Sequence, residues 1–107
     1  MSKQVDLPIH PWRILAVSGR IDALTGAATE RACHEALQQD PRLALDLRAV
    51  SYLSSAGLRV LLSTLKLAAS RNGAFALIAP QEGVREVLDM SGFSRIIPIV
   101  DDTSNLA

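Results

Sequence analysis

Two adjacent serines are the residues of this chain whose position is most suggestive of chemistry. Ser54 and Ser55 lie in the segment SYLSSAGLRVLL, residues 51 to 62, where a polar and apolar alternation gives way to leucines at helical spacing. A hydroxyl at such a junction can cap the helix, attack a substrate as a nucleophile, or accept a phosphate. The small residues Ala56 and Gly57 follow without a bulky shield. We therefore expect both hydroxyls to be accessible.

The surrounding sequence argues against nucleophilic catalysis. The nucleophile elbow of hydrolases reads Gly-x-Ser-x-Gly, but Leu53 stands two residues before Ser55. The candidate bases are His10, near the N-terminus, and His34, beside the apolar stripe of an expected helix. The sequence has no glycine-rich phosphate loop that ends in Gly-Lys-Ser/Thr. We expect no catalytic residues, no enzymatic activity and no nucleotide cofactor.

The cysteine and histidine content also limits the chemistry. Cys33 is the single cysteine, so it cannot form an internal disulfide, and with two histidines it cannot complete a recognisable zinc site. Its position on an apolar helical stripe favours a small core residue over a reactive thiol. No metal or cofactor site is expected.

Charge and hydropathy exclude two further classes of function. Eleven basic and eleven acidic residues cancel, which removes the electrostatic attraction that dominates nucleic-acid binding. No apolar run approaches the roughly 18 residues of a membrane-spanning helix, and the first residues, MSKQVDLPIHPWR, lack the apolar core of a secretory signal. We expect a soluble, cytoplasmic protein that neither binds nucleic acid directly nor inserts into a membrane.

Alternating strand and helix periods predict the elements that must position the serines. Such alternation is typical of α/β domains with a mainly parallel sheet, here of four to five strands with three or more helices. We expect one domain over residues 1–107, with its core at about 13–102. The expected strands are 13–18, 42–50, 74–79 and 95–100, with perhaps another in the first dozen residues, and the expected helices are Thr25–Gln39, Ser55–Arg71 and Gln81–Met90.

Several residues are expected to begin or end these elements. Thr25, or less favourably Asp22, is expected to cap the first helix through its side chain. Asn72-Gly73 supplies a residue that tolerates positive φ at the end of the second helix. Pro98 favours an edge position for the last strand because proline cannot donate to a ladder. The polar tail from Asp101 is expected to fray.

Three segments together resemble one known family. They are VSGRIDALTG, DLRAVSYLSSAGLRVLL and NGAFALIAPQEGVREVLDMSGFSRIIPIVDD, and they cover nearly all of the chain from about Arg13 to Asp102. In these segments the chain resembles STAS domains of the bacterial anti-sigma-factor antagonist type. The frequent loop pattern of that family is Asp-Ser-Ser/Thr-Gly. Here Ser54 stands in place of the aspartate and Ala56 in place of the second hydroxyl residue.

The resemblance implies a phosphorylation-controlled partner switch. In that family the serine two residues before the loop glycine is phosphorylated, which is Ser55 here. The unphosphorylated antagonist binds an anti-sigma factor that is also a serine kinase of the histidine-kinase-like ATPase type, and so releases the sigma factor. Phosphorylation ends the complex, and a metal-dependent serine phosphatase reverses it. The implied partner-binding residues are Asp22, Ser54, Ser55, Ala56, Gly57 and Leu58.

Two alternatives from other classes stay open at the level of sequence. One is a STAS accessory subunit that docks on an ABC transporter for lipids. The other is a scaffold component of a stress-signalling complex, which is disfavoured because no N-terminal sensor segment is attached. A simpler interpretation of the loop is that one serine only caps the helix, but a cap accounts for one hydroxyl and not for two.

Overall fold

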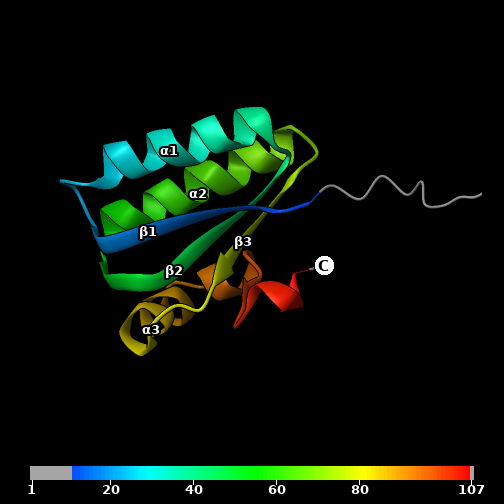
Figure 1. The fold of residues 1–107 in the computed structure, drawn as a ribbon. Coiled ribbons are helices and arrows are strands. Elements are labelled where there is room, and N and C mark those ends of the chain that lie inside the picture. Colours follow the sequence, from blue (N-terminus) through cyan, green and yellow to red (C-terminus); the bar gives the residue numbers. More distant parts are fainter. Residues whose placement is uncertain (1–10, 107) are drawn as a thin grey trace, which may run out of the picture.

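The computed structural model describes residues 11–106, and these form one parallel sheet with helices on both faces. The strand order is β1-β2-β3-β4, and all three neighbouring pairs are parallel. Helices α1 and α2 lie side by side over one face, and α3 lies on the other (Figure 1). The bounds are β1 Arg13–Ile21, α1 Gly26–Gln39, β2 Arg42–Leu53, α2 Ser55–Ser70, β3 Ala74–Ile78, α3 Glu82–Met90 and β4 Ile99–Val100.

Strand β2 is the centre of the core. Leu43, Leu45 and Leu47 alternate along it and are fully buried, and Ala44 between them is buried as well. A strand buried on both faces has to be apolar at both sets of alternating positions, which this segment is. The prediction of an interior strand is confirmed. The predicted α/β class is confirmed too, and the four parallel strands and three α-helices fall within the predicted four to five strands and three or more helices.

The first two strands run further than the sequence indicated. Strand β1 was expected to end at Ser18 but continues to Ile21, and β2 was expected to end at Val50 but continues to Leu53. The register between them shifts at Ala16/Ser18 and again at Gly19/Arg20. At the second shift the extra residue is Ser51 of β2, next to the partner of Gly19, and pairing then resumes. Gly19 itself has a φ of 79°, a value that glycine adopts at low cost. A glycine that indicated a strand end therefore lies beside a bulge of the neighbouring strand.

The expected helices form with small shifts at their ends. Helix α1 begins at Gly26, α2 ends at Ser70 and α3 begins at Glu82, each one residue inside the predicted bounds. Asn72 follows α2 with a φ of 56°, which confirms the residue of positive φ predicted there. The periodicity of apolar residues was a sufficient guide to all three helices.

The last strand and the tail differ from expectation. The predicted strand 95–100 is reduced to β4, because Phe93–Arg95 form a 3₁₀ turn, η1, and Ile97 is buried outside any strand. Pro98 precedes this edge strand and contributes its carbonyl, which accepts the N–H of Leu77 at 2.9 Å. The edge position is confirmed.

The tail was expected to fray, but it forms a second 3₁₀ turn, η2, at Thr103–Asn105, where the Asp102 side chain accepts the N–H of Ser104. The possible strand in the first dozen residues lies largely outside the described part of the chain.

Candidate functional site

The serine loop lies at the carboxyl end of β2, where the chain turns into α2. Ser54 is the N-cap residue, and its Oγ accepts the backbone N–H of Gly57 at 3.2 Å. The backbone N–H of Ser54 donates to the Ile21 carbonyl at 3.1 Å, and its hydroxyl also lies 3.4 Å from that oxygen. Ser54 thus provides an acceptor for the Gly57 N–H of the helix and a donor for the Ile21 carbonyl at the end of β1. The capping role predicted for one of the two serines belongs to Ser54.

Ser55 is the first residue of α2, and its side chain is exposed. Among the described residues it has no hydrogen-bond partner for its hydroxyl. The first turn of α2 contains no acidic residue, so the positive end of the helix dipole is not neutralised there by a carboxylate of the helix. Within residues 11–106 the Ser55 hydroxyl is therefore unpartnered, whereas that of Ser54 is occupied.

Gly57 fixes the position of α2 against the sheet. It is buried, and a Cβ atom at this position would lie 2.4 Å from the Ile21 carbonyl oxygen and 2.6 Å from Leu53 Cδ1. No side chain fits into that gap unless β1 or the helix moves. The glycine lets the helix start close to the ends of both strands, which keeps Ser55 at a defined place on the surface.

The turn after β1 is closed by the Asp22 carboxylate. Its Oδ1 accepts the backbone N–H groups of Leu24 at 3.0 Å and Thr25 at 3.2 Å, and its Oδ2 accepts Arg20 Nε at 3.0 Å. The hydrogen bond from Arg20 and those from the backbone outweigh partial burial and lower the pKa of Asp22 below its ordinary value. Asp22 is therefore ionised at neutral pH and holds the turn in one shape.

The prediction that Thr25 caps α1 through its side chain is wrong. The Thr25 hydroxyl donates to the Arg20 carbonyl at 2.7 Å and accepts the backbone N–H of Asp22 at 3.0 Å. Both bonds face back into the turn, so neither reaches the first turn of the helix. Asp22, the second candidate, also closes the turn with its side chain, and its backbone carbonyl accepts the N–H of Gly26 at 2.7 Å.

The structure brings the six predicted site residues to one end of the sheet. The hydrogen bond from Ser54 to Ile21 ties the serine loop to the Asp22 turn, and both lie where β1 and β2 end (Figure 1). Ser55 is exposed, while Asp22, Ser54, Ala56 and Leu58 are partly buried and Gly57 is buried. Leu58 packs against the core. Ser55 is thus the member of the set that is most open to a partner.

Sequence reasoning missed two features of this end. The Arg20 guanidinium lies over the Tyr52 ring, 4.2 Å from its centroid, at a position where the two residues are partners in the β1–β2 register. Leu24, in the turn, is 93% exposed. The signal for Leu24 was present in RIDALTG, where one large apolar residue stands in a turn sequence. The exposure of the Leu24 side chain depends on the shape of the turn that the Asp22 hydrogen bonds close. Those bonds cannot be identified from the sequence.

The other candidate groups lie away from this end. Cys33 is fully buried, and burial raises the pKa of its thiol to about 11, so it is protonated at neutral pH, in line with the predicted core role. His34 Nε2 lies 3.0 Å from Ser63 Oγ, which joins α1 to α2. Among residues 11–106 no cluster of histidine, cysteine or acidic residues could hold a metal ion, and no helix there is long and apolar enough to cross a membrane.

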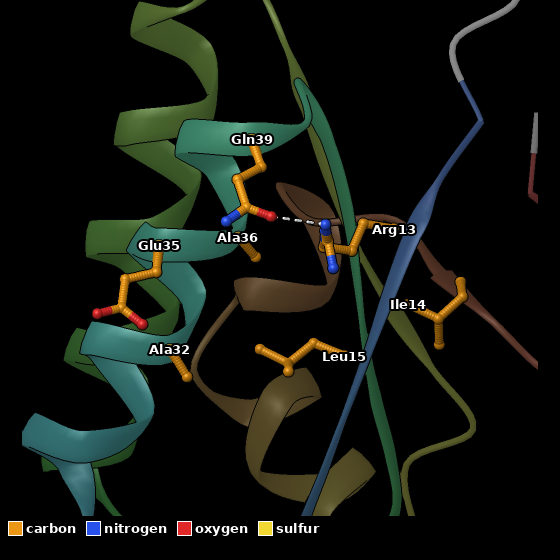
Figure 2. Close-up of a pocket in the computed structure, with 7 residues that line it drawn as sticks. All are labelled: Arg13, Ile14, Leu15, Ala32, Glu35, Ala36 and Gln39. Carbon is orange, nitrogen blue, oxygen red and sulfur yellow. Dashed lines mark hydrogen bonds between the residues drawn. The ribbon is translucent and has the colours of Figure 1, made fainter.

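A cavity of about 260 Å³ lies at the opposite end of β1. Figure 2 shows Arg13 and Leu15 directed towards α1 while Ile14 points away, and the helix contributes Ala32, Glu35, Ala36 and Gln39. Arg13 Nη2 donates to Gln39 Oε1 at 2.8 Å, and Arg13 is also paired with Asp40. The cationic group of the cavity is therefore already paired within the chain. The cavity is separate from the serine loop.

Comparison with known proteins identifies the family of this chain. The sequence model of the STAS domain matches residues 3–106. The chain is 32% identical over 108 residues to the anti-sigma F factor antagonist of Paenibacillus polymyxa, an alignment that covers 98% of this chain and 92% of the relative. The chain therefore belongs to the STAS domain family. Within that family it is similar to anti-sigma factor antagonists.

Solved structures agree with this placement. An anti-sigma factor antagonist from Mycobacterium paratuberculosis superimposes with a TM-score of 0.79 at 28% identity, over 89% of this chain and 81% of that one. The anti-sigma factor antagonist SpoIIAA in its unphosphorylated form has a TM-score of 0.65 at 16% identity, over 92% and 86% of the two chains. The second likeness shows that the fold is shared.

Proposed function

We propose that this chain is an anti-sigma-factor antagonist whose binding to an anti-sigma serine kinase is switched off by phosphorylation of Ser55. The kinase is of the histidine-kinase-like ATPase type, and a serine phosphatase resets the switch. The chain is a binding module and a kinase substrate in this scheme, and it acts in the cytoplasm as one domain over residues 1–107. The observation that carries the proposal is the difference between the two serines. Ser54 caps α2, whereas Ser55 beside it is exposed.

The position of Ser55 suits a charge switch. A phosphate would add a charge of about −1.5 to −2 at the amino end of α2, where the helix dipole stabilises negative charge. The free protein should therefore tolerate the phosphate without unfolding. A partner surface that is complementary to a neutral hydroxyl would have to desolvate that charge without an opposite charge to pair with it, which weakens the complex.

The test is to map the phosphate. Wild type, Ser55→Ala and Ser54→Ala are each incubated with ATP, Mg²⁺ and the anti-sigma kinase of the source organism, and the products are analysed by mass spectrometry. We expect one phosphate at Ser55 in wild type and in Ser54→Ala, and none in Ser55→Ala. Calorimetric titration should then show that phosphorylated protein binds the kinase about a hundredfold more weakly than unphosphorylated protein, a difference of about 2.7 kcal/mol.

Two results would contradict the proposal. One is a kinase that binds the wild type tightly but phosphorylates another residue or none. The other is phosphorylation at Ser55 that leaves the affinity for the kinase unchanged. The first would reduce Ser55 to a surface residue of the helix, and the second would separate modification from partner choice.

A further inference from the structure

A small apolar surface lies beside the switch and has no role so far. Ala23, Leu24, Ala27 and Ala28 are all exposed, and we call them the Leu24 patch. The sequence from Ala23 to Thr29 contains no charged residue. Leu24 is 93% exposed, more than Met90 at 84% and the other exposed large apolar side chains of the described chain. A lone exposed leucine is ordinary, but one with exposed alanines next to it in the sequence is a candidate contact surface.

The backbone under Leu24 is held in place before any partner arrives. Asp22 Oδ1 accepts the N–H of Leu24 and of Thr25, and the Thr25 hydroxyl bridges to the Arg20 carbonyl. The carboxylate is itself held by Arg20. An apolar side chain on a preorganised turn loses little further freedom when it is buried by a partner, so more of its burial free energy appears as affinity.

The Leu24 patch lies at the same end of the sheet as the Ser55 loop. Ile21, three residues before Leu24, accepts the N–H of Ser54 at 3.1 Å, and the amino ends of α1 and α2 lie side by side (Figure 1). A partner that covers Ser55 therefore has the start of α1 within its reach. The uncharged composition of the patch fits an apolar depression on that partner.

From these observations we infer that Leu24 is the apolar anchor by which the anti-sigma kinase holds this chain, separate from the Ser55 hydroxyl that switches the complex. This inference rests on the proposed function and adds a residue to it. The two residues act on different steps. Leu24 contributes to affinity through apolar burial, whereas Ser55 determines which phosphorylation state is accepted.

The experiment compares Leu24→Ala, Leu24→Met and Met90→Ala with wild type, using the anti-sigma kinase of the source organism as the probe. Met90 is the matched control because it is also highly exposed but belongs to α3, on the other face of the sheet. We expect Leu24→Ala to weaken kinase binding roughly tenfold, from the loss of buried apolar area. Leu24→Met and Met90→Ala should bind as wild type does. Thermal unfolding should be the same for all four proteins, because neither side chain is packed.

Kinetics provide a second readout. In phosphorylation assays Leu24→Ala should raise the KM for this chain about tenfold while kcat stays within about twofold, because binding is lost and the chemistry at Ser55 is not. Equal binding of Leu24→Ala and wild type would overturn the inference and leave the proposed function standing. Equal weakening by Met90→Ala would also overturn it. If the kinase bound wild type not at all, the proposed function would fail, and the inference with it.

Discussion

The two serines differ by one position and have different surroundings. Ser54 is tied to Gly57 and Ile21, whereas the Ser55 hydroxyl points to solvent at the first turn of α2. A cap stabilises the folded state because it satisfies a backbone donor that otherwise has no partner. In the switch proposed above, structural and regulatory roles would therefore be carried by separate residues, and a mutation could affect one without the other.

This separation predicts unequal losses of stability for the two alanine variants. Ser54→Ala should lower the free energy of unfolding by about 1 kcal/mol, because the Gly57 donor loses its acceptor. Ser55→Ala should change it by less than about 0.5 kcal/mol, as for most exposed positions. Urea denaturation followed by circular dichroism measures both. If Ser55→Ala proved the more destabilising of the two, Ser55 would be the structural serine and the switch would be wrongly placed.

At the scale of the elements, the site depends on how closely α2 approaches the end of β1. That approach is possible because residue 57 has no side chain. Only Ser54 separates β2 from α2, and its bond to the Ile21 carbonyl ties the serine loop to the start of the Asp22 turn. The arrangement makes the start of α2 sensitive to even one added methyl group.

Gly57→Ala should therefore destabilise the protein by about 1 to 3 kcal/mol, the range for overpacked sites, because the new Cβ meets a backbone oxygen that cannot rotate away. Gly83→Ala is the matched control. Gly83 lies in α3, its φ is not positive, and an alanine Cβ at this position would have no atom within 4 Å beyond its chain neighbours and its own helix backbone. That control should raise stability by about 0.4 to 1 kcal/mol. Thermal or urea unfolding compares the two. A neutral Gly57→Ala would mean that the loop can shift without cost, and that its geometry is not fixed by this contact.

The elements also show what the sequence could and could not predict. The spacing of apolar residues predicted all three helices, with Val84, Val87 and Leu88 as the signal for the third, and the Leu43, Leu45, Leu47 alternation predicted the central strand. The end of β1 was misjudged because Gly19 looks the same in a sequence whether it ends a strand or adopts a positive φ within one. The capping serine could not be chosen from two identical neighbours. Its identity depends on the Ile21 carbonyl, a contact between residues 33 positions apart.

At the scale of the whole molecule, the site lies at one end of the parallel sheet. Strand β2 is buried through Leu43 to Leu45, and α1, α2 and α3 all contact it. Close-packed interiors do not deform gradually, so an added charge at the surface of α2 has no soft element to move. The switch proposed for Ser55 therefore acts on the partner's surface and does not need a change of fold in this chain.

The aspartate variant tests this at the scale of the whole chain. Ser55→Asp places a negative group at the amino end of α2, which should raise the free energy of unfolding by a few tenths to about 1 kcal/mol. In ¹H–¹⁵N correlation spectra of the free protein, amide shifts should change at residues 20–26 and 52–58 and stay constant along β3 and α3. Ser55→Ala provides the reference for loss of the hydroxyl alone. Shifts that spread through β3 to α3 would show a conformational switch instead. Because the free protein is stabilised while the complex must desolvate an unpaired charge, folding and kinase binding should change in opposite directions in this one variant.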